Sequence, residues 1–275
     1  MAVIIRPGAT NTNKATVLWD NVFRGGILAN ILGTSNDHPP INAISDDATW
    51  SKWEKSSATT STRFDIDLGD EVAIDCVGVS AHNLSTAGSE FRVDRSDDGV
   101  NFSSIFPYVD PDGDNDFMVI FPEVSARHYR IWFRASPDSS WPVAFIGNIF
   151  AGKRLVFPHA PVDSYTPLHH ARRYEKLYND SIKGHFLSNR VMSAGAETEV
   201  DMGFLDRGWL ENNIRGFESH YNQGGTFFYC SSPSKYPDDM GYCRSRGSDE
   251  SLDIEFIEGD KLASLSFGVR SYVGS

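Results

Sequence analysis

The sequence predicts a mostly β protein with two units: an N-terminal jelly-roll β-sandwich, then a mixed β-rich domain with one prominent helix. Three observations favour this fold class. Many short runs alternate polar and apolar side chains with period two, as half-buried strands do. Turn-forming Gly, Asp and Pro residues separate these runs. Only one segment has apolar side chains at clear helical spacing, and 275 residues suffice for one large or two ordinary domains.

The first unit, residues 1–151, is predicted to be all β. Its alternating or apolar runs lie at residues 62–68, 73–79, 90–95, 117–121, 128–133 and 145–150. Turn signals between them include Leu68-Gly69-Asp70, and Asp98-Gly99 can supply the positive φ of a tight hairpin. Many short strands with few helical patterns are typical of a sandwich or jelly roll.

The second unit, residues 152–275, is predicted to be mixed. A helix is expected from about 207 to 222, with Asp206 as N-cap and Gly224-Gly225 as the stop. One helix face would carry Leu210, Ile214, Phe217 and Tyr221. Strands are expected at residues 197–202, 226–230, 251–257 and 262–272. No long linker separates the units, so we expect them to pack closely.

Charge and cysteine usage exclude several classes of protein. The net charge is −12, with 11 basic and 20 acidic residues (−9) in 1–151 and 14 and 17 (−3) in 152–275. Nucleic acid and anionic lipid are therefore not expected partners, since both need clustered Lys and Arg. The sequence has no run of about 18 apolar residues, so membrane insertion is not expected. The apolar run near its start is too short for the core of a signal peptide. Three cysteines without a CxxC motif are expected to be free thiols in a cytosolic fold.

Local patterns between residues 42 and 150 occur in the order of a known module. They are NAISDDATW at 42–50, FDIDLG at 64–69, VGV at 77–79, FRVDRSDDGVNF at 91–102 and ARHYRI at 126–131. These patterns resemble discoidin-type modules, also called coagulation factor 5/8 C-type or galactose-binding-like domains. Phe102 replaces the usual Trp of the hairpin. The resemblance implies a jelly roll whose end loops often bind sugars.

Most of residues 152–275 resembles the C-terminal region of tail-tip proteins of tailed bacteriophages. The segments are GKRLVFPHAPV at 152–162, GHFLSNR at 184–190, TFFY at 226–229 and YPDDMGY at 236–242. Ser188-Asn189 departs from the family's G-x-F-L-G-R pattern. The resemblance implies a structural tail-tip or baseplate component in the virion, assembled in the host cytoplasm. It also implies a homo-oligomeric ring, a trimer or hexamer, that docks other tail proteins or fibres.

Sugar binding by the first unit would use aromatic stacking and polar side chains near the loops. The candidates are Trp50, Trp53, His82, Asn83 and Trp141. The alternative is structural: the tryptophans would anchor the core or rim, and His82-Asn83 would cap its own loop backbone. The module would then be a docking surface only.

Four aspartates within seven residues are a candidate Ca²⁺ site, because Ca²⁺ prefers oxygen ligands. They are Asp110, Asp112, Asp114 and Asp116. The segment does not fit the EF-hand loop, which needs Gly at position six and Glu at position twelve. Here Gly113 stands at position four and Phe121 at position twelve. The alternative is a solvated hairpin tip, and no other cofactor is expected.

Basic and apolar residues of the second unit are candidates for a subunit interface: His169, His170, Arg172, Arg173, Arg190 and Phe217. Adjacent histidines point to different sides and seldom chelate one metal. Residues 169–173 are expected to form an exposed inter-subunit patch or a solvated loop. Arg154 and Arg190 would pair with acidic faces of neighbours, and Phe217 would enter an apolar interface or core.

No catalytic motif is present: the sequence has no G-x-S-x-G, Walker loop, G-x-G-x-x-G or H-E-x-x-H. We therefore expect no enzyme. The function predicted is that of a ring-forming subunit of a phage tail tip or baseplate. The alternative is a carbohydrate-binding module that attaches the virion to host surface glycan.

Overall fold

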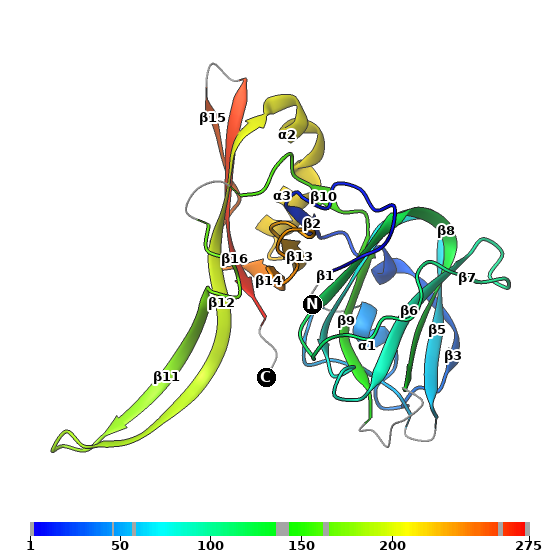
Figure 1. Cartoon of the computed structure of the whole chain (residues 1–275), viewed down its shortest axis with the longest axis horizontal. Helices are drawn as coiled ribbons and strands as arrows, with labels where there is room; N and C mark the ends of the chain where they lie inside the picture. The colour runs from blue at the N-terminus through cyan, green and yellow to red at the C-terminus, as the bar shows by residue number, and fades with distance from the viewer. Residues whose placement is uncertain are drawn as a thin grey trace.

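The computed structural model describes residues 3–45, 47–56, 59–135, 143–161, 165–257 and 261–272. The chain is mostly β, with two eight-stranded sheets and few helices, as predicted. Figure 1 shows the two sheets side by side, with a long curved hairpin extending away from the body. No helix in these ranges is long and apolar enough to cross a membrane.

The first sheet closes into the jelly-roll sandwich. Its strands are β1 (Val3–Ile5), β3 (Ile27–Leu32), β4 (Trp53–Glu54), β5 (Ser61–His82), β6 (Ser89–Ser96), β7 (Ser103–Ser104), β8 (Phe117–Ala135) and β9 (Phe145–Gly152). Their order is β4-β9-β5-β8-β6-β7, while β1 pairs with β8 and β3 with β5. A 3-10 turn, η1 (Val22–Gly25), and a short helix, α1 (Ile41–Ile44), contact β9.

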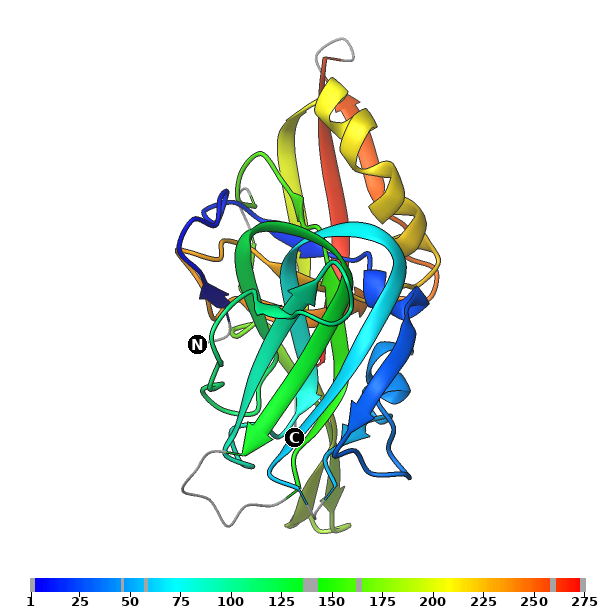
Figure 2. The ribbon, with the colours of Figure 1, turned by 90° about the vertical axis from the view of Figure 1, so that its right-hand side faces the viewer.

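The two long strands β5 and β8 build both layers of the sandwich. The predicted strands at 62–68 and 73–79 are one strand, β5, with a register shift between Asp67 and Val72. Its first half pairs with β3 and its second half with β9. Gly69 adopts a φ of 82°, which a residue with a Cβ rarely takes. The expected turn is therefore a bulge that bends a continuous strand around the sandwich, as Figure 2 shows.

The second sheet contains a strand from the N-terminal region. Its strands are β2 (Thr16–Leu18), β10 (Leu155–Val156), β11 (Arg172–Asp180), β12 (Phe186–Asp206), β13 (Phe227–Cys230), β14 (Met240–Ser245), β15 (Asp253–Ile257) and β16 (Leu262–Ser271). Their order is β10-β2-β13-β14-β16-β12-β11, and β15 pairs with β16. Strand β2 comes before residue 151 in the sequence but belongs to the second sheet, so the two sheets do not coincide with the two predicted ranges. The boundary between 1–151 and 152–275 stays a prediction.

The expected helix consists of two consecutive segments, α2 (Arg207–Asn213) and α3 (Arg215–Asn222). Asp206 caps α2 by accepting a hydrogen bond from the Trp209 N–H at 2.9 Å. All four residues of the predicted apolar face are buried against the second sheet: Leu210, Ile214, Phe217 and Tyr221. The helical spacing therefore identified the buried face correctly.

The two units share one apolar core at their junction. Phe228, Cys230, Met240 and Tyr242 of the second sheet belong to the core cluster of the jelly roll. The ring of Phe150 in β9 lies 5.6 Å from the Phe228 ring and 5.7 Å from the Tyr242 ring. A Cβ on Gly78 would lie 2.7 Å from the Phe228 ring, so only glycine allows this approach.

Candidate functional site

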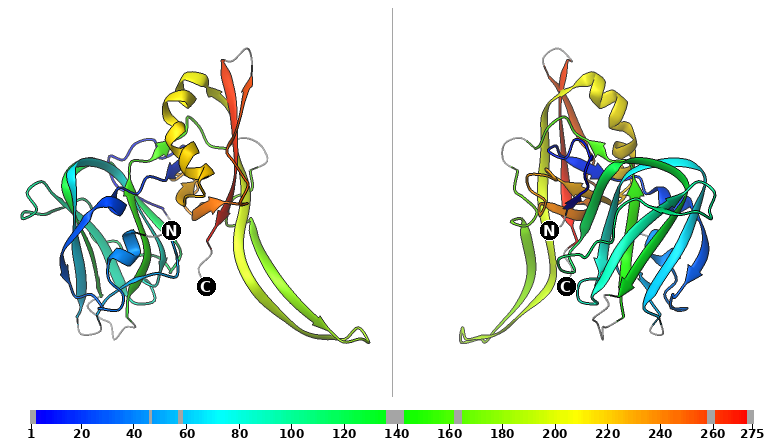
Figure 3. Two further views of the ribbon diagram at one scale, coloured as in Figure 1. Left: turned by 180° about the vertical axis from the view of Figure 1, so that it is seen from behind. Right: turned by 45° about the vertical axis from the view of Figure 1, so that its right-hand side comes forward.

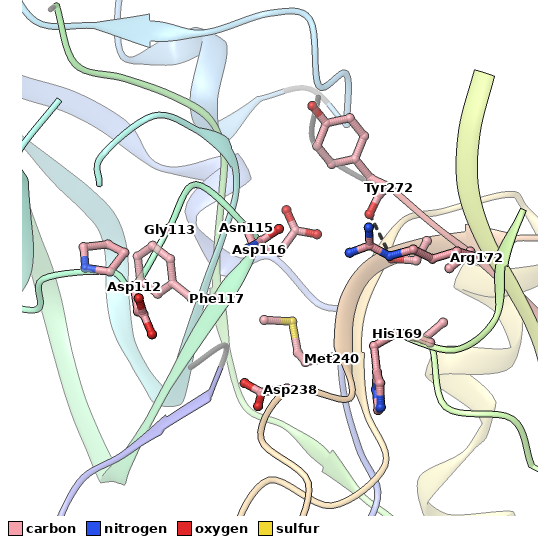
Figure 4. A pocket seen from close by; sticks show the side chains of 14 residues that line it. Asp112, Gly113, Asn115, Asp116, Phe117, His169, Arg172, Asp238, Met240 and Tyr272 are labelled. Carbon is pink, nitrogen blue, oxygen red and sulfur yellow. Dashed lines mark hydrogen bonds between the residues drawn. The ribbon is translucent and has the colours of Figure 1, made fainter. Parts of the chain in front are cut away.

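A cavity of about 250 Å³ lies at the junction of the two units. Residues 111–113 and 115–117 of the jelly roll form one wall, and His169, Arg172, Met240 and Tyr272 contribute to the other. Figure 4 shows Asp116 on the first of these walls. The cavity therefore exists only because the two units pack together.

Asp116 accepts hydrogen bonds at both carboxylate oxygens, and one of these bonds links the two units. Its Oδ1 accepts a hydrogen bond from Ser80 Oγ at 2.7 Å, and its Oδ2 accepts one from the Tyr242 N–H at 2.9 Å. Burial raises the pKa of Asp116 to about 6, because the charged form is desolvated. Asp116 is thus a buried structural acceptor at the junction.

The predicted Ca²⁺ cluster does not come together, and this prediction is corrected. Asp114 accepts hydrogen bonds from the Thr86 N–H at 3.0 Å and the Thr86 hydroxyl, while Asp116 faces Ser80 and Tyr242. Asp110 is exposed. Across the described residues, no group of three or more His, Cys, Asp or Glu side chains is placed to hold a metal ion. Alternate residues of the segment serve different neighbours, so their oxygens do not converge.

A second hollow of about 460 Å³ opens between the Trp50 loop and the second sheet. Trp50 is 84% exposed at its rim. The Tyr242 hydroxyl lies 3.1 Å from the Asp47 carbonyl oxygen and 2.7 Å from Thr226 Oγ1, which ties this loop to the second sheet. Arg244 and Arg270 line the same hollow. An exposed indole and two guanidinium groups therefore line the same hollow.

The other predicted sugar-binding residues are not part of this hollow. Trp53 is fully buried, with its ring 4.6 Å from Phe64 and 4.3 Å from Phe133, so it is a core anchor and cannot stack on a ligand. The amide of Asn83 binds the Val143 carbonyl oxygen at 2.9 Å and the Phe145 N–H at 2.7 Å. Trp141 lies outside the described residues.

His82 also has a structural role. Its Nε2 lies 2.8 Å from the Asn115 carbonyl oxygen, and its Nδ1 accepts a hydrogen bond from the Leu84 N–H at 3.2 Å. The neutral ring with a proton on Nε2 satisfies both partners. Burial lowers the pKa of His82 to about 4. Of the expected alternative, a loop that caps its own backbone, only the contact between Leu84 N–H and His82 is local; the other partners of His82 and Asn83 are distant in sequence.

The hairpin formed by β11 and the first part of β12, residues 172–194, projects from the body, and we call it the arm (Figures 1 and 3). Gly184, with a φ of 78°, closes its turn. Apolar side chains are exposed on both strands: Tyr174, Leu177, Tyr178, Ile182, Phe186, Leu187, Val191 and Met192. An isolated two-stranded ribbon is marginally stable in water, and exposed apolar patches mark interaction sites. The arm is therefore the strongest candidate interaction surface of this chain.

The predicted interface residues separate into two groups. His169, His170, Arg172, Arg173 and Arg190 are exposed at the base of the arm or on it. Phe217 is fully buried, and its ring lies 5.2 Å from Phe227 and 5.6 Å from Phe267. Its assignment to a subunit interface is corrected: it belongs to the core between α3 and the sheet.

Arg154 is likewise internal. Its guanidinium binds Asp75 Oδ2 through Nε at 3.0 Å and Nη2 at 2.9 Å, and its backbone N–H binds Asp75 Oδ1. The expected pairing with a neighbour's acidic face is therefore corrected for Arg154. The three cysteines are buried and free, as predicted, and burial raises the pKa of each thiol.

Two features escaped the sequence analysis. The exposed arm could have been found from the alternation in residues 172–180 and the Ser181 to Gly184 turn. The hollow lined by Trp50, Arg244 and Arg270 had no local signal, because it depends on how the units pack.

No protein-family model matches the sequence, and no curated protein matches it significantly. Similar solved structures include chitosan-binding module 1 of a chitosanase/glucanase from Paenibacillus sp. IK-5, 12% identical, covering 48% of this chain and 98% of that chain, with a TM-score of 0.41. A Clostridium perfringens CBM32 module in complex with GalNAc-β-1,3-galactose is 14% identical over 48% and 99% of the two chains, with a TM-score of 0.40. A pectin-binding module is 18% identical over 46% and 88%, with a TM-score of 0.37.

Longer proteins are matched only in part. This chain spans 28% of the length of SpGH29 and 14% of a family 89 glycoside hydrolase from Clostridium perfringens. The three structures of the preceding paragraph are carbohydrate-binding modules, and each aligns with about half of this chain. At these identities and TM-scores, the likeness assigns no ligand to this chain.

Proposed function

We propose that this chain is a structural subunit whose arm packs against a second copy. The exposed apolar arm carries the proposal, because its eight apolar side chains contact no core in the single chain. Burying apolar surface contributes about 25 cal/mol per Å², so an arm of this kind gains stability from a partner.

Charge complementarity supports another copy of this chain as the partner. Residues 172–194 contain five basic and two acidic residues, a net charge of +3. The whole chain carries −12, so the remainder carries −15. A basic arm on an acidic body favours head-to-tail contact, and head-to-tail contacts close into rings when the rotation permits.

The setting that we propose is a phage tail tip or baseplate in the virion, without catalysis, where the ring would dock other tail proteins or fibres. The resemblance of residues 152–275 supports this setting. The segment GHFLSNR spans the tip and return strand of the arm, whereas TFFY and YPDDMGY cover parts of β13 and β14 in the body. One motif of the resemblance therefore lies on the arm, and the others belong to the sheet that carries it.

Sedimentation velocity of the full chain and of a Phe186→Ser/Leu187→Ser variant tests this function. Both positions are exposed, so the variant should fold normally. We expect the wild type to sediment as a discrete oligomer and the variant as a monomer. An oligomer of unchanged size in the variant would refute the role of the arm.

Glycan binding is a second candidate function, favoured by the exposure of Trp50 beside the 460 Å³ hollow. Aromatic rings can stack on the apolar faces of sugars. The modules quoted above are named for binding chitosan and pectin or are bound to a disaccharide. A glycan array with the wild type and Trp50→Ala tests this function: we expect signals that disappear in the variant, and unchanged signals would exclude the Trp50 site.

A further inference from the structure

The hollow beside Trp50 contains two arginines that oppose each other on neighbouring strands. Arg244 of β14 and Arg270 of β16 are direct cross-strand partners. Like charges directly opposite each other in an antiparallel pair are destabilising. This arrangement has an electrostatic cost that a bound anion would offset.

The protein supplies too little negative charge to offset this cost. Arg270 Nε lies 3.7 Å from Glu197 Oε1, but Arg173 Nη1 lies 3.2 Å from Oε2 of the same carboxylate. Arg244 forms no ion pair with any residue that the structure describes. Among the residues that the structure describes, Asp47 is the one acidic residue that lines the hollow, and the Arg24 guanidinium engages it. The hollow thus has an excess of positive charge in a protein of net charge −12.

The remaining groups suit a sugar ring. Trp50 offers an exposed planar surface, and Thr226 and Tyr272 offer hydroxyl groups. The volume of about 460 Å³ is within the range of roughly 300–1,000 Å³ that is typical of small-ligand sites. A guanidinium binds a carboxylate with two parallel hydrogen bonds, which gives both strength and orientation.

We propose that this hollow binds a carboxylated saccharide, with the sugar ring on Trp50 and its carboxylate at Arg244 and Arg270. The inference rests on the second candidate function, glycan binding, and names its ligand class. Nucleic acid fits less well, because the acidic body would repel a phosphate backbone.

Titration calorimetry of the full chain with two matched ligands tests the inference. The ligands are α-1,4-linked galacturonic acid trimer and α-1,4-linked galactose trimer, which differ only in the carboxylate at C6. We expect the acidic trimer to bind at least tenfold more tightly, since a charge-assisted hydrogen bond contributes about that factor. We expect Trp50→Ala to weaken binding of both trimers.

Variants separate the carboxylate contact from general charge. Arg244→Gln should weaken binding of the acidic trimer about tenfold and leave the neutral trimer unchanged. Arg127→Gln is the control, because Arg127 pairs with Asp67 on the jelly roll and does not line the hollow. Equal weakening by both variants would show nonspecific attraction and overturn the inference.

Other outcomes separate this inference from the function on which it rests. Equal affinity for the two trimers overturns the acidic ligand class while glycan binding stands. If neither trimer binds and the glycan array is empty, both are refuted. If a glutamate hexapeptide binds and the acidic trimer does not, the proposal of a saccharide ligand is overturned. The two arginines would then bind an acidic protein segment.

Discussion

Asp116 accepts the backbone N–H of Tyr242 at 2.9 Å, and this hydrogen bond joins the jelly roll to the second sheet. The Tyr242 hydroxyl reaches back to the Asp47 carbonyl oxygen and to Thr226. Tyr242 of β14 therefore lines the hollow beside Trp50 and binds Asp116, which lines the other cavity at the junction. The junction is specified by polar contacts within an apolar core, which makes its stability sensitive to pH.

Asp116→Asn should change how stability depends on pH. Burial raises the pKa of Asp116 from 3.8 to about 6, so the folded state binds more protons than the unfolded state between these values. This group alone makes the free energy of unfolding fall by about 2 kcal/mol as pH rises from 4 to 6. The variant lacks this contribution to the free energy of unfolding, so its stability should decrease on acidification. Urea unfolding at pH 4, 5, 6 and 7 measures this decrease.

His82→Gln should have the opposite effect. Its folded pKa is lowered from 6.5 to about 4, so the unfolded state binds more protons in this range. This group alone makes stability fall by about 3 kcal/mol as pH drops from 6.5 to 4. In the wild type the two groups nearly cancel, whereas His82→Gln should become more stable between pH 6 and pH 4. The same slope in both single variants would contradict the assigned pKa shifts.

Arg154→Ala should cost about 3–5 kcal/mol of unfolding free energy, because it leaves the partly buried Asp75 carboxylate unpaired. The matched control is Arg127→Ala, which removes an exposed ion pair with Asp67 and should cost no more than about 1 kcal/mol. Chemical denaturation of both variants at pH 7 provides the comparison. Similar losses would mean that Arg154 contributes no more than a surface residue.

Phe217→Ala should destabilise the fold by about 3–5 kcal/mol, since its ring is fully buried against Phe227 and Phe267. Phe186→Ala on the arm should leave the thermal stability of the monomer unchanged, because Phe186 is 92% exposed in the single chain. Melting temperature and sedimentation together separate core residues from arm residues. Unchanged melting of Phe217→Ala would contradict its place in the core.

Periodicity predicted the elements that are half-buried and locally regular. The strands at 90–95 and 262–272 and the buried helix face with Phe217 follow the expected pattern. The turn at Leu68-Gly69-Asp70 was wrong as a strand end, because a glycine bulge bends a long strand without ending it. Whether a bulge or a hairpin forms depends on distant partners, which local sequence does not contain.

The candidate sites were harder to predict for the same reason. Trp50 and Trp53 are three residues apart, yet one is exposed and the other is fully buried. Their difference depends on packing against Phe64 and Phe133, which are remote in sequence. The aspartates at 110–116 resembled a metal site because the distant partners of two of them, Thr86 for Asp114 and Tyr242 for Asp116, are not visible in the local sequence.

The measurement that tests the central claim most directly is the mass of the full chain by light scattering over a range of concentrations. If the arm of one copy packs on the body of the next, the mass should reach a discrete multiple of 30.6 kDa and stay there. Because arm and body have opposite charge, high salt should shift the balance toward the monomer. A monomer at every concentration, or a mass unaffected by Phe186→Ser/Leu187→Ser, would contradict the account.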